Sequence, residues 1–254
     1  MDGVVPWRYT RWEAGEAKAV DGALVDEQWV HIHVNGLELA TIMASPVHLD
    51  WLALGFLRSE GLIDGPQDIR LVEVCPNKAC VDVWLHKADF APPTRAIVTS
   101  GCGGGLTFDD LSQRVPPLEA GMRLAPQQIN DSMRQLLAAA TLYNLSRGVH
   151  TSALSDGQQL TAVAEDVGRH NTIDKLWGFC LSQDLDPAGH MLLATGRISS
   201  EMINKAAKMR LPVVVSRTSP TGLSVRLAQE WNITLIGYAR GNSFNVYAGE
   251  WRLT

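Results

Sequence analysis

Cys102 is the residue whose surroundings most favour reactive chemistry. It follows a short apolar run and stands within Ser100-Gly101-Cys102-Gly103-Gly104-Gly105. Glycines on both sides remove side-chain bulk, so the thiol can project from an exposed loop whose N–H groups could stabilise a thiolate or persulfide anion. A glycine-rich turn that happens to contain a cysteine explains the same residues equally well, so the residues alone leave both interpretations open.

The other three cysteines, at positions 75, 80 and 180, carry weaker signals. The spacing of Cys75 and Cys80 would suit half of a metal site or a redox pair. A structural zinc site needs four ligands, and the sequence has no second CxxC or HxxxH pair, so the pattern favours two thiols flanking a hairpin turn. Cys180 falls on the inward face of an expected helix and is predicted to be a core residue.

Three polar segments combine basic, hydroxyl and acidic side chains directly after expected strands: residues 165–171 (EDVGRHN), 195–201 (TGRISSE) and 216–221 (SRTSPT). Each precedes a helix, whose free N–H groups and dipole favour an anion. The carboxyl ends of strands in an α/β sheet meet at one edge, so the segments together predict a site for a phosphorylated or nucleotide ligand. Ser and Thr are also ordinary helix caps. Neither GxGxxG nor GxxxxGK(S/T) is present, which argues against a Rossmann or P-loop site.

Two further groups of residues favour a role in binding. His170 alone would be typical of a structural histidine, but its neighbours Arg169 and Asn171 favour a place in the site. Residues 244–249 follow a turn beside Arg240 and could stack on and hydrogen-bond a base or a pterin, although composition alone favours an edge strand. This stretch comprises Phe244, Asn245, Val246, Tyr247, Ala248 and Gly249.

Two kinds of secondary structure must position these residues. The first predicted element is a hairpin over residues 28–43 with Asn35-Gly36 at its turn, followed by a helix over 49–59 and a second hairpin over 69–85. After residue 118, strands alternate with helices, the first helix running from Pro126 past Tyr143. The predicted fold class is therefore α/β, with a smaller N-terminal α+β domain (residues 1–118) that ends in the cysteine loop. The C-terminal domain (residues 119–254) is predicted to have three layers.

Composition limits the classes of function. The net charge of −5 gives no electrostatic reason to expect a nucleic-acid partner, and the longest apolar stretches are far too short to span a membrane. The N-terminus lacks a basic start followed by an apolar run, so no signal peptide is predicted and we expect a cytoplasmic protein.

Several motifs resemble, in the right order, those of the formate dehydrogenase accessory sulfurtransferase family. The resemblance extends from about residue 36 to residue 247, which makes it far more specific than any single motif. The cysteine loop resembles that of the family as well. The other motifs are residues 52–61 (LALGFLRSEG), 165–175 (EDVGRHNTIDK), 195–201 (TGRISSE), 215–221 (VSRTSPT) and 237–247 (GYARGNSFNVY).

The resemblance implies a sulfur carrier for molybdenum enzymes. Cys102 matches the cysteine that takes sulfur from a cysteine desulfurase as a persulfide and passes it to the molybdenum cofactor, bis-molybdopterin guanine dinucleotide. Residues 244–249 match the cofactor-binding stretch, where GDP-like nucleotides could also bind, and Arg169, Arg197 and Arg217 are candidates for the phosphates. The implied partners are the desulfurase and the catalytic subunit of formate dehydrogenase. The implied C-terminal fold is similar to that of cytidine deaminases, and the family's members look like dimers.

One departure from the family pattern concerns the cysteine loop. Many members have a second cysteine where this chain has Gly105, so a disulfide within the loop is not available here. One thiol suffices to hold a persulfide. The alternative is a chaperone that binds the cofactor or the dehydrogenase without thiol chemistry. A zinc-dependent deaminase is disfavoured, because the chain has neither H-x-E nor P-C-x-x-C.

Overall fold

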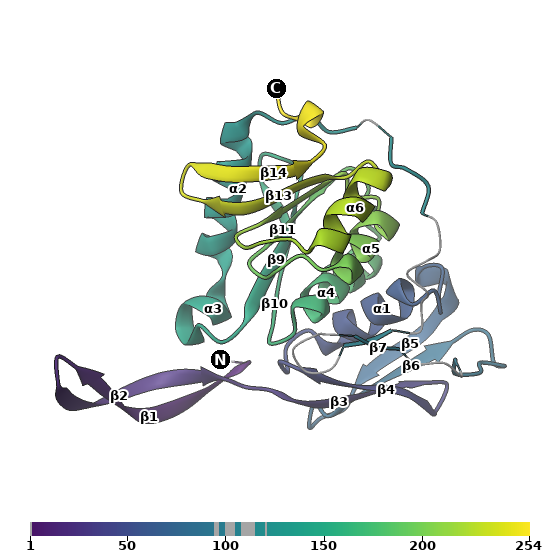
Figure 1. Ribbon diagram of the computed structural model, residues 1–254. Coiled ribbons are helices and arrows are strands. Elements are labelled where there is room, and N and C mark those ends of the chain that lie inside the picture. The colour runs from purple at the N-terminus through teal and green to yellow at the C-terminus, as the bar shows by residue number, and fades with distance from the viewer. Residues whose placement is uncertain (1, 94–96, 100–104, 108–114, 120) are drawn as a thin grey trace.

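The largest sheet among the described residues has six strands, in the order β10-β9-β11-β12-β13-β14 (Figure 1). A computed structural model describes residues 2–93, 97–99, 105–107, 115–119 and 121–254. The three inner strands β11, β12 and β13 are parallel, whereas β9, β10 and β14 join by antiparallel pairing. The bounds are β9 His150–Ser155, β10 Leu160–Asp166, β11 Met191–Ala194, β12 Val213–Ser216, β13 Thr234–Arg240 and β14 Ser243–Ala248.

Helices cover both faces of this sheet. Successive residues of β11 and β12 point to opposite faces: Leu193 and Val215 pack with α2, while Leu192 and Val214 pack with the helices on the other side. Burial on both faces explains why these strands are continuous apolar runs. The α/β class and the three layers that the sequence predicts are confirmed. The helices are α2 (Pro126–Ala139) on one face, and α4 (Arg169–Ser182), α5 (Ser200–Lys208) and α6 (Gly222–Glu230) on the other.

The helix predicted to run from Pro126 past Tyr143 is in fact two helices. It breaks at Ala140, which has φ −74° and ψ 82°, and α3 (Thr141–Ser146) begins immediately afterwards. The carboxylate of Glu165 accepts the N–H groups of Leu142 (2.7 Å) and Tyr143 (2.9 Å). A tertiary contact from β10 therefore starts a new helix where the apolar periodicity alone would continue the old one.

The N-terminal unit is a four-stranded sheet, in the order β4-β3-β6-β5, with α1 (Leu49–Ser59) on one face. Both hairpins predicted from the sequence are confirmed. In the first, Asn35 and Gly36 take the positive φ values of 50° and 81° that a two-residue turn requires. The strands are β3 (Gln28–Val34), β4 (Leu37–Ala44), β5 (Ile69–Val74) and β6 (Cys80–Leu85), and a 3-10 turn, η1 (Pro66–Asp68), precedes β5.

Helix α1 joins the two sheets by packing directly on α4 (Figure 1). A Cβ atom on Gly55 would overlap the backbone carbonyl of Asp174, and one on Gly178 would overlap the carbonyl of Trp51. The helices therefore touch backbone to backbone at two glycines. The position of the domain boundary near residue 118 stays a prediction.

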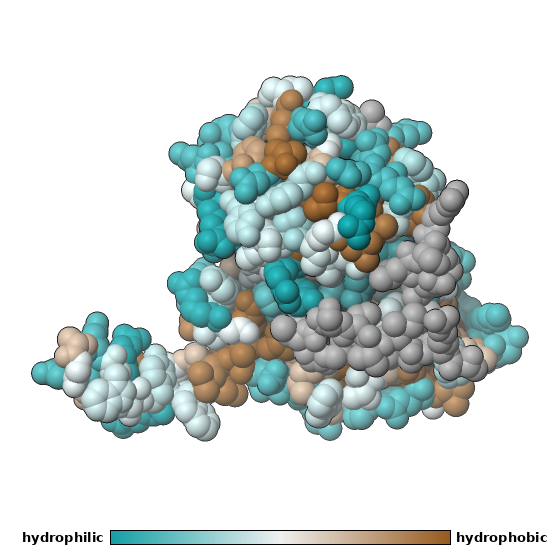
Figure 2. All heavy atoms as spheres, viewed as in Figure 1, coloured by the Kyte–Doolittle hydropathy of each residue, from teal (hydrophilic) through white to brown (hydrophobic). Residues whose placement is uncertain are grey.

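An N-terminal hairpin of β1 (Val4–Glu13) and β2 (Glu16–Val25) projects from the body in Figure 1. The elements predicted from the sequence begin at residue 28 and do not include this hairpin, although Val5, Trp7 and Tyr9 alternate with other residues as in a strand. No residue of either strand is fully buried, and Trp12 is 73% exposed. Figure 2 shows mainly hydrophilic and intermediate colours along this arm. In the described part of the chain, no helix has the length and apolar character needed to cross a membrane.

Candidate functional site

The three polar segments meet at one edge of the six-stranded sheet, as the sequence predicts. β10, β11, β12 and β13 all end there, because β10 and β11 each pair antiparallel with β9, and β11 to β13 are parallel. Ser216 Oγ donates to the carbonyl of Gly196 (2.6 Å), and Arg217 N donates to that of Ala194 (3.1 Å). The segments after β11 (residues 195–201) and β12 (residues 216–221) are therefore joined by hydrogen bonds. We call this end of the sheet, with the arginines that lie on it, the arginine edge.

The arginines of this edge differ in exposure. Arg197 is exposed and Arg217 is half-buried, whereas Arg169 is only 4% exposed. Arg240, the last residue of β13, is exposed, and its Nε donates to the carbonyl of Arg217 at 2.9 Å. Arg197, Arg217 and Arg240 are thus the guanidinium groups of this edge that reach solvent. The sequence analysis names Arg240 beside residues 244–249 but not among the candidates for phosphates; its place at a strand end before Gly241 was the available signal.

His150 is a second residue of this edge that the sequence does not single out. It begins β9, and a Cβ atom on Gly196 would lie 2.9 Å from its Nδ1 and 3.4 Å from the Cβ of Arg169. Glycine at position 196 therefore makes room for both side chains. Burial, followed by the charge of Arg169, lowers the pKa of His150, so its imidazole is neutral near pH 7 and can serve as a hydrogen-bond partner. The signal was a polar residue at the start of an apolar strand.

The predicted cofactor-binding stretch forms β14, the edge strand that composition alone favoured. It runs away from the arginine edge: Asn245 pairs with Gly237, whereas Ala248 pairs with Leu235, nearer the start of β13. A Cβ atom on Gly237 would lie 3.0 Å from the ring of Tyr247. The same Cβ atom would also lie 2.9 Å from the backbone carbonyl oxygen of Thr218, in the segment after β12, so the ring of Tyr247 lies next to the arginine edge.

The remaining members of the stretch lie elsewhere. Phe244 and Val246 are partly buried and pack on the α2 side of the sheet, and Ala248 is buried. Thr234 Oγ1 donates to the carbonyl of Gly249 at 2.7 Å, near the start of β13. Asn245, which is exposed, and Tyr247 are therefore the members that lie beside Gly237 and face the arginine edge.

Residues 165–175 mainly hold the two sheets together. The fully buried Asp166 and Lys175 form an ion pair (Oδ2 to Nζ, 2.6 Å). Ser45 of the N-terminal unit donates its N–H to Asp166 (3.1 Å) and accepts from Lys175 (3.2 Å). Asn171 Nδ2 donates to the carbonyl of Met43 at 2.9 Å. The structure places Asn171 in this joint rather than beside the open arginines.

His170 faces a charged interior between α4 and α5. Its Nδ1 lies 3.4 Å from Glu201 Oε2, and burial, with Lys205 and Arg169, lowers its pKa to about 2, so the ring is neutral. Lys205 bonds both carboxylate oxygens of Asp174 at 2.6 Å. Burial alone would lower the pKa of Lys205, but the nearby carboxylates outweigh it and raise that pKa. His170 is only 6% exposed and belongs to this interior.

Cys102 lies outside the described residues, but both ends of its loop are described. β7 (Ile97–Thr99) pairs antiparallel with β8 (Gly105–Thr107), with Thr99 opposite Gly105. Cys102 is therefore three residues from each member of this pair. Thr107 Oγ1 donates to Glu60 Oε2 at 2.9 Å, and β8 contacts β4. The cysteine loop thus begins and ends beside the C-terminal end of α1.

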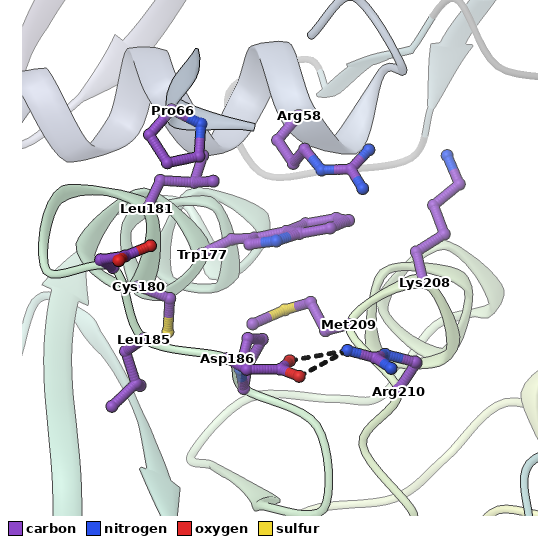
Figure 3. Close-up of a pocket in the computed structure, with 12 residues that line it drawn as sticks. Arg58, Pro66, Trp177, Cys180, Leu181, Leu185, Asp186, Lys208, Met209 and Arg210 are labelled. Atoms are coloured by element: carbon purple, nitrogen blue, oxygen red, sulfur yellow. Dashed lines mark hydrogen bonds and ion pairs between the residues drawn. The ribbon is translucent and has the colours of Figure 1, made fainter. Parts of the chain in front are cut away.

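The other cysteines are accounted for by the structure. Cys180 is 1% exposed and lines a cavity of about 270 Å³ beneath Arg58 and Trp177 (Figure 3). Burial raises the pKa of its thiol to about 12, so it stays protonated, as expected of a core residue. Cys75 and Cys80 are joined in a disulfide. The prediction of two separate thiols was wrong, because the hairpin brings their Cα atoms to 5.3 Å, within disulfide range.

The fold and the site define an α/β protein with an arginine-lined sheet edge and a separate cysteine loop. A model of the FdhD/NarQ family matches residues 25–254, and the chain belongs to this family. The sulfur carrier protein FdhD of Staphylococcus haemolyticus (strain JCSC1435) is 36% identical over 244 residues, which cover 94% of this chain and 92% of that protein. The protein of the same name from Staphylococcus aureus (strain MRSA252) has the same identity and coverage.

A solved structure is similar over the whole chain. The crystal structure of a formate dehydrogenase accessory protein from Desulfotalea psychrophila covers 99% of both chains, with 28% identity and a TM-score of 0.80. The family that the sequence motifs resemble is therefore confirmed.

Proposed function

We propose that this protein carries sulfur on Cys102 as a persulfide, between a cysteine desulfurase and the molybdenum cofactor of formate dehydrogenase. The chain has four cysteines. Cys75 and Cys80 are oxidised to a disulfide, and Cys180 is buried with its pKa raised to about 12. A thiolate is the form that attacks sulfur, so Cys102 is left as the nucleophile. This elimination of the other three cysteines is the main support for the proposal.

The loading step is a thiol–persulfide exchange. The Cys102 thiolate attacks the terminal sulfur of the desulfurase persulfide, a new S–S bond forms on Cys102, and the donor cysteine leaves as a thiolate. No external oxidant or reductant is consumed. The relatives named sulfur carrier protein support this chemistry for the chain.

The arginine edge is the proposed binding site for the substrate cofactor, bis-molybdopterin guanine dinucleotide. Arg197, Arg217 and Arg240 present exposed or half-exposed guanidinium groups, which suit phosphate oxygens because of their bidentate geometry. Within residues 244–249, Asn245 and Tyr247 lie nearest to these arginines and could bond and stack on a base. Arg169, which is nearly buried next to Gly196, would contribute its positive charge to the binding of the phosphates.

A charged interior lies between the cysteine loop and the arginine edge. Glu60, which holds the loop's β8 strand through Thr107, is near enough to Lys205 to contribute to its raised pKa. Lys205 and Arg169 in turn both act on the pKa of His170. We propose that the two sites serve the two halves of one transfer, with the desulfurase meeting the loop and the cofactor meeting the edge.

The alternative is a chaperone that binds the cofactor or the dehydrogenase without thiol chemistry, and the glycine at position 105 favours it. Formate dehydrogenase activity in cells that lack the native carrier separates the two functions. Cys102→Ala should fail to restore activity, whereas Cys180→Ser should restore it. Restoration by Cys102→Ala would leave the chaperone as the function. A homodimer, the cytoplasm and contact with the catalytic subunit of formate dehydrogenase are further parts of the proposal.

A further inference from the structure

The outer face of the four-stranded sheet carries four potential metal ligands. They are His33 of β3, Cys80 and Asp82 of β6, and Cys75, which directly follows β5. In β3, Val30, Ile32 and Val34 point toward α1, so His31 and His33 point outward. β6 runs parallel to β3, with His31 opposite Cys80 and His33 opposite Asp82. The pairing thus sets an imidazole, a sulfur and a carboxylate side by side on the face away from α1.

The ligand atoms of this group are close together. His33, Cys80 and Asp82 each offer an atom within 4.8 Å of the others, and His33 Nδ1 lies 3.3 Å from Asp82 Oδ1. Both sulfurs, of Cys75 and Cys80, lie 3.9 Å from Asp82 Oδ2. Nδ1 of His33 is buried and has no hydrogen-bond partner among the described residues.

We propose that reduction of the Cys75–Cys80 disulfide creates a zinc site made of both thiolates, His33 and Asp82. A dithiol reductant gives two electrons and two protons to the S–S bond and becomes a disulfide. Zn²⁺ then displaces the two thiol protons as it binds. The sequence appeared to lack half of such a site because the other two ligands come from β3 and from Asp82 two residues beyond Cys80 in β6.

The ligand set is the one that zinc prefers. Thiolate and imidazole ligands with a carboxylate suit a borderline cation and disfavour Mg²⁺ and Ca²⁺, which take oxygen ligands. With metal–ligand distances of roughly 2.0–2.3 Å, ligands of a tetrahedral site are roughly 3.3–3.8 Å apart. The separations among His33, Cys80 and Asp82, of up to 4.8 Å, are close to that range. Cys75 is not within that limit of all three, and opening the disulfide frees its sulfur to rotate toward the ion.

His31 provides a matched control on the same strand and face. Its ring is 6.4 Å from that of His33, but its Nδ1 is engaged by Thr41 Oγ1 (2.9 Å) and Glu38 Oε1 (3.2 Å). His31 is not among the residues whose ligand atoms come within 4.8 Å of one another, so it is not expected to be a ligand. The proposal does not depend on the sulfur-carrier function, since Cys102 takes no part in it.

The test uses the full chain with Cys102→Ala, so that the loop thiol does not contribute. The protein is reduced with dithiothreitol, desalted without oxygen, and titrated with Co²⁺ and then Zn²⁺. The thiolate-to-cobalt absorption band and native mass spectrometry report binding. The reduced protein should bind one ion, and the oxidised protein should bind at least about 100-fold more weakly, because it lacks both thiolates.

The variants identify the ligands. Cys75→Ser with Cys80→Ser should abolish the band, and His33→Gln and Asp82→Asn should each weaken binding by at least about 10-fold. His31→Gln should bind as the parent does. The proposal is overturned by a disulfide that dithiothreitol cannot open or by a reduced protein without a one-to-one ion. Binding that survives the double serine variant, or that weakens equally in His31→Gln and His33→Gln, also overturns it.

Discussion

The joint between the two sheets and the arginine edge are both built from charged and polar residues, but they differ in burial. In the joint, Asp166 and Lys175 are fully buried, and each has several partners. At the edge, Arg197 and Arg240 are exposed, and Arg217 is half-buried. Both regions come from motifs that, in the sequence, resemble ligand-binding loops. The comparison teaches that a charged motif after a strand can hold two sheets together where it is buried, and that a similar motif leaves its charged groups open to solvent where it is exposed.

The largest expected effect is on the joint. Asp166→Ala would leave the Lys175 ammonium buried without its carboxylate, which should lower the free energy of unfolding by about 3–5 kcal/mol. Asp186 and Arg210 form a matched pair at the same 2.6 Å distance but more than half exposed, so Asp186→Ala should cost at most about 1 kcal/mol. Urea unfolding measures both. Equal costs would contradict the role of burial.

The contact between α1 and α4 should be the next most sensitive. Gly178→Ala would force a Cβ atom into the backbone of α1 and should destabilise the protein by about 3 kcal/mol, although alanine favours helices. Gly121 has open space around its Cβ position, so Gly121→Ala should be neutral or slightly stabilising. Thermal unfolding of the two variants checks this, and a stabilised Gly178→Ala variant would show that the helices do not touch there.

The arginine edge should respond in binding and not in stability. Arg217→Ala should weaken the binding of GDP, a substitute for the nucleotide half of the cofactor, by about 10-fold, since a charge-assisted hydrogen bond contributes about 1.5 kcal/mol or more. Arg70→Ala, an exposed arginine on β5, should leave GDP affinity unchanged. Calorimetry measures both. Unchanged affinity in Arg217→Ala would remove this residue from the site.

The last expected effect, which is small only near pH 6, is a pH dependence from the charged interior. Burial lowers the pKa of His170 to about 2, far below its unfolded value near 6.5, so the unfolded state binds more protons between these values. Stability should therefore fall as pH drops below about 6.5, by up to about 1.4 kcal/mol per pH unit from this group. His170→Gln should remove that part of the slope, while His86→Gln, at an exposed position, should retain it. Equal slopes in both variants would place the cause elsewhere.

Local signals in the sequence predict a large part of the fold. Asn35-Gly36 predicts the first hairpin because few residues adopt its positive φ values, and the apolar residues at helical spacing over residues 49–59 predict α1. The three polar segments meet at one edge, as the order of strands and helices predicts. Elements whose stability comes from local residues are therefore the ones that can be foreseen.

Features that depend on distant contacts could not be predicted. The helix break at Ala140 depends on Glu165, and the Cys75–Cys80 disulfide depends on the register of β5 and β6. The N-terminal hairpin has no fully buried residue, so the short alternation of Val5, Trp7 and Tyr9 has no core face to match. For the site, the sequence identifies the arginine segments but cannot tell that Asn171 faces the joint, because burial of a polar residue is set by the partner sheet.

The most direct test of the central claim is the mass of the intact protein after incubation with a cysteine desulfurase and L-cysteine. The wild type should gain one sulfur, roughly 32 Da, and Cys180→Ser should gain the same. Cys102→Ala should gain none. A wild type that gains no sulfur, or a Cys102→Ala variant that still gains one, would contradict the assignment of Cys102 as the sulfur carrier.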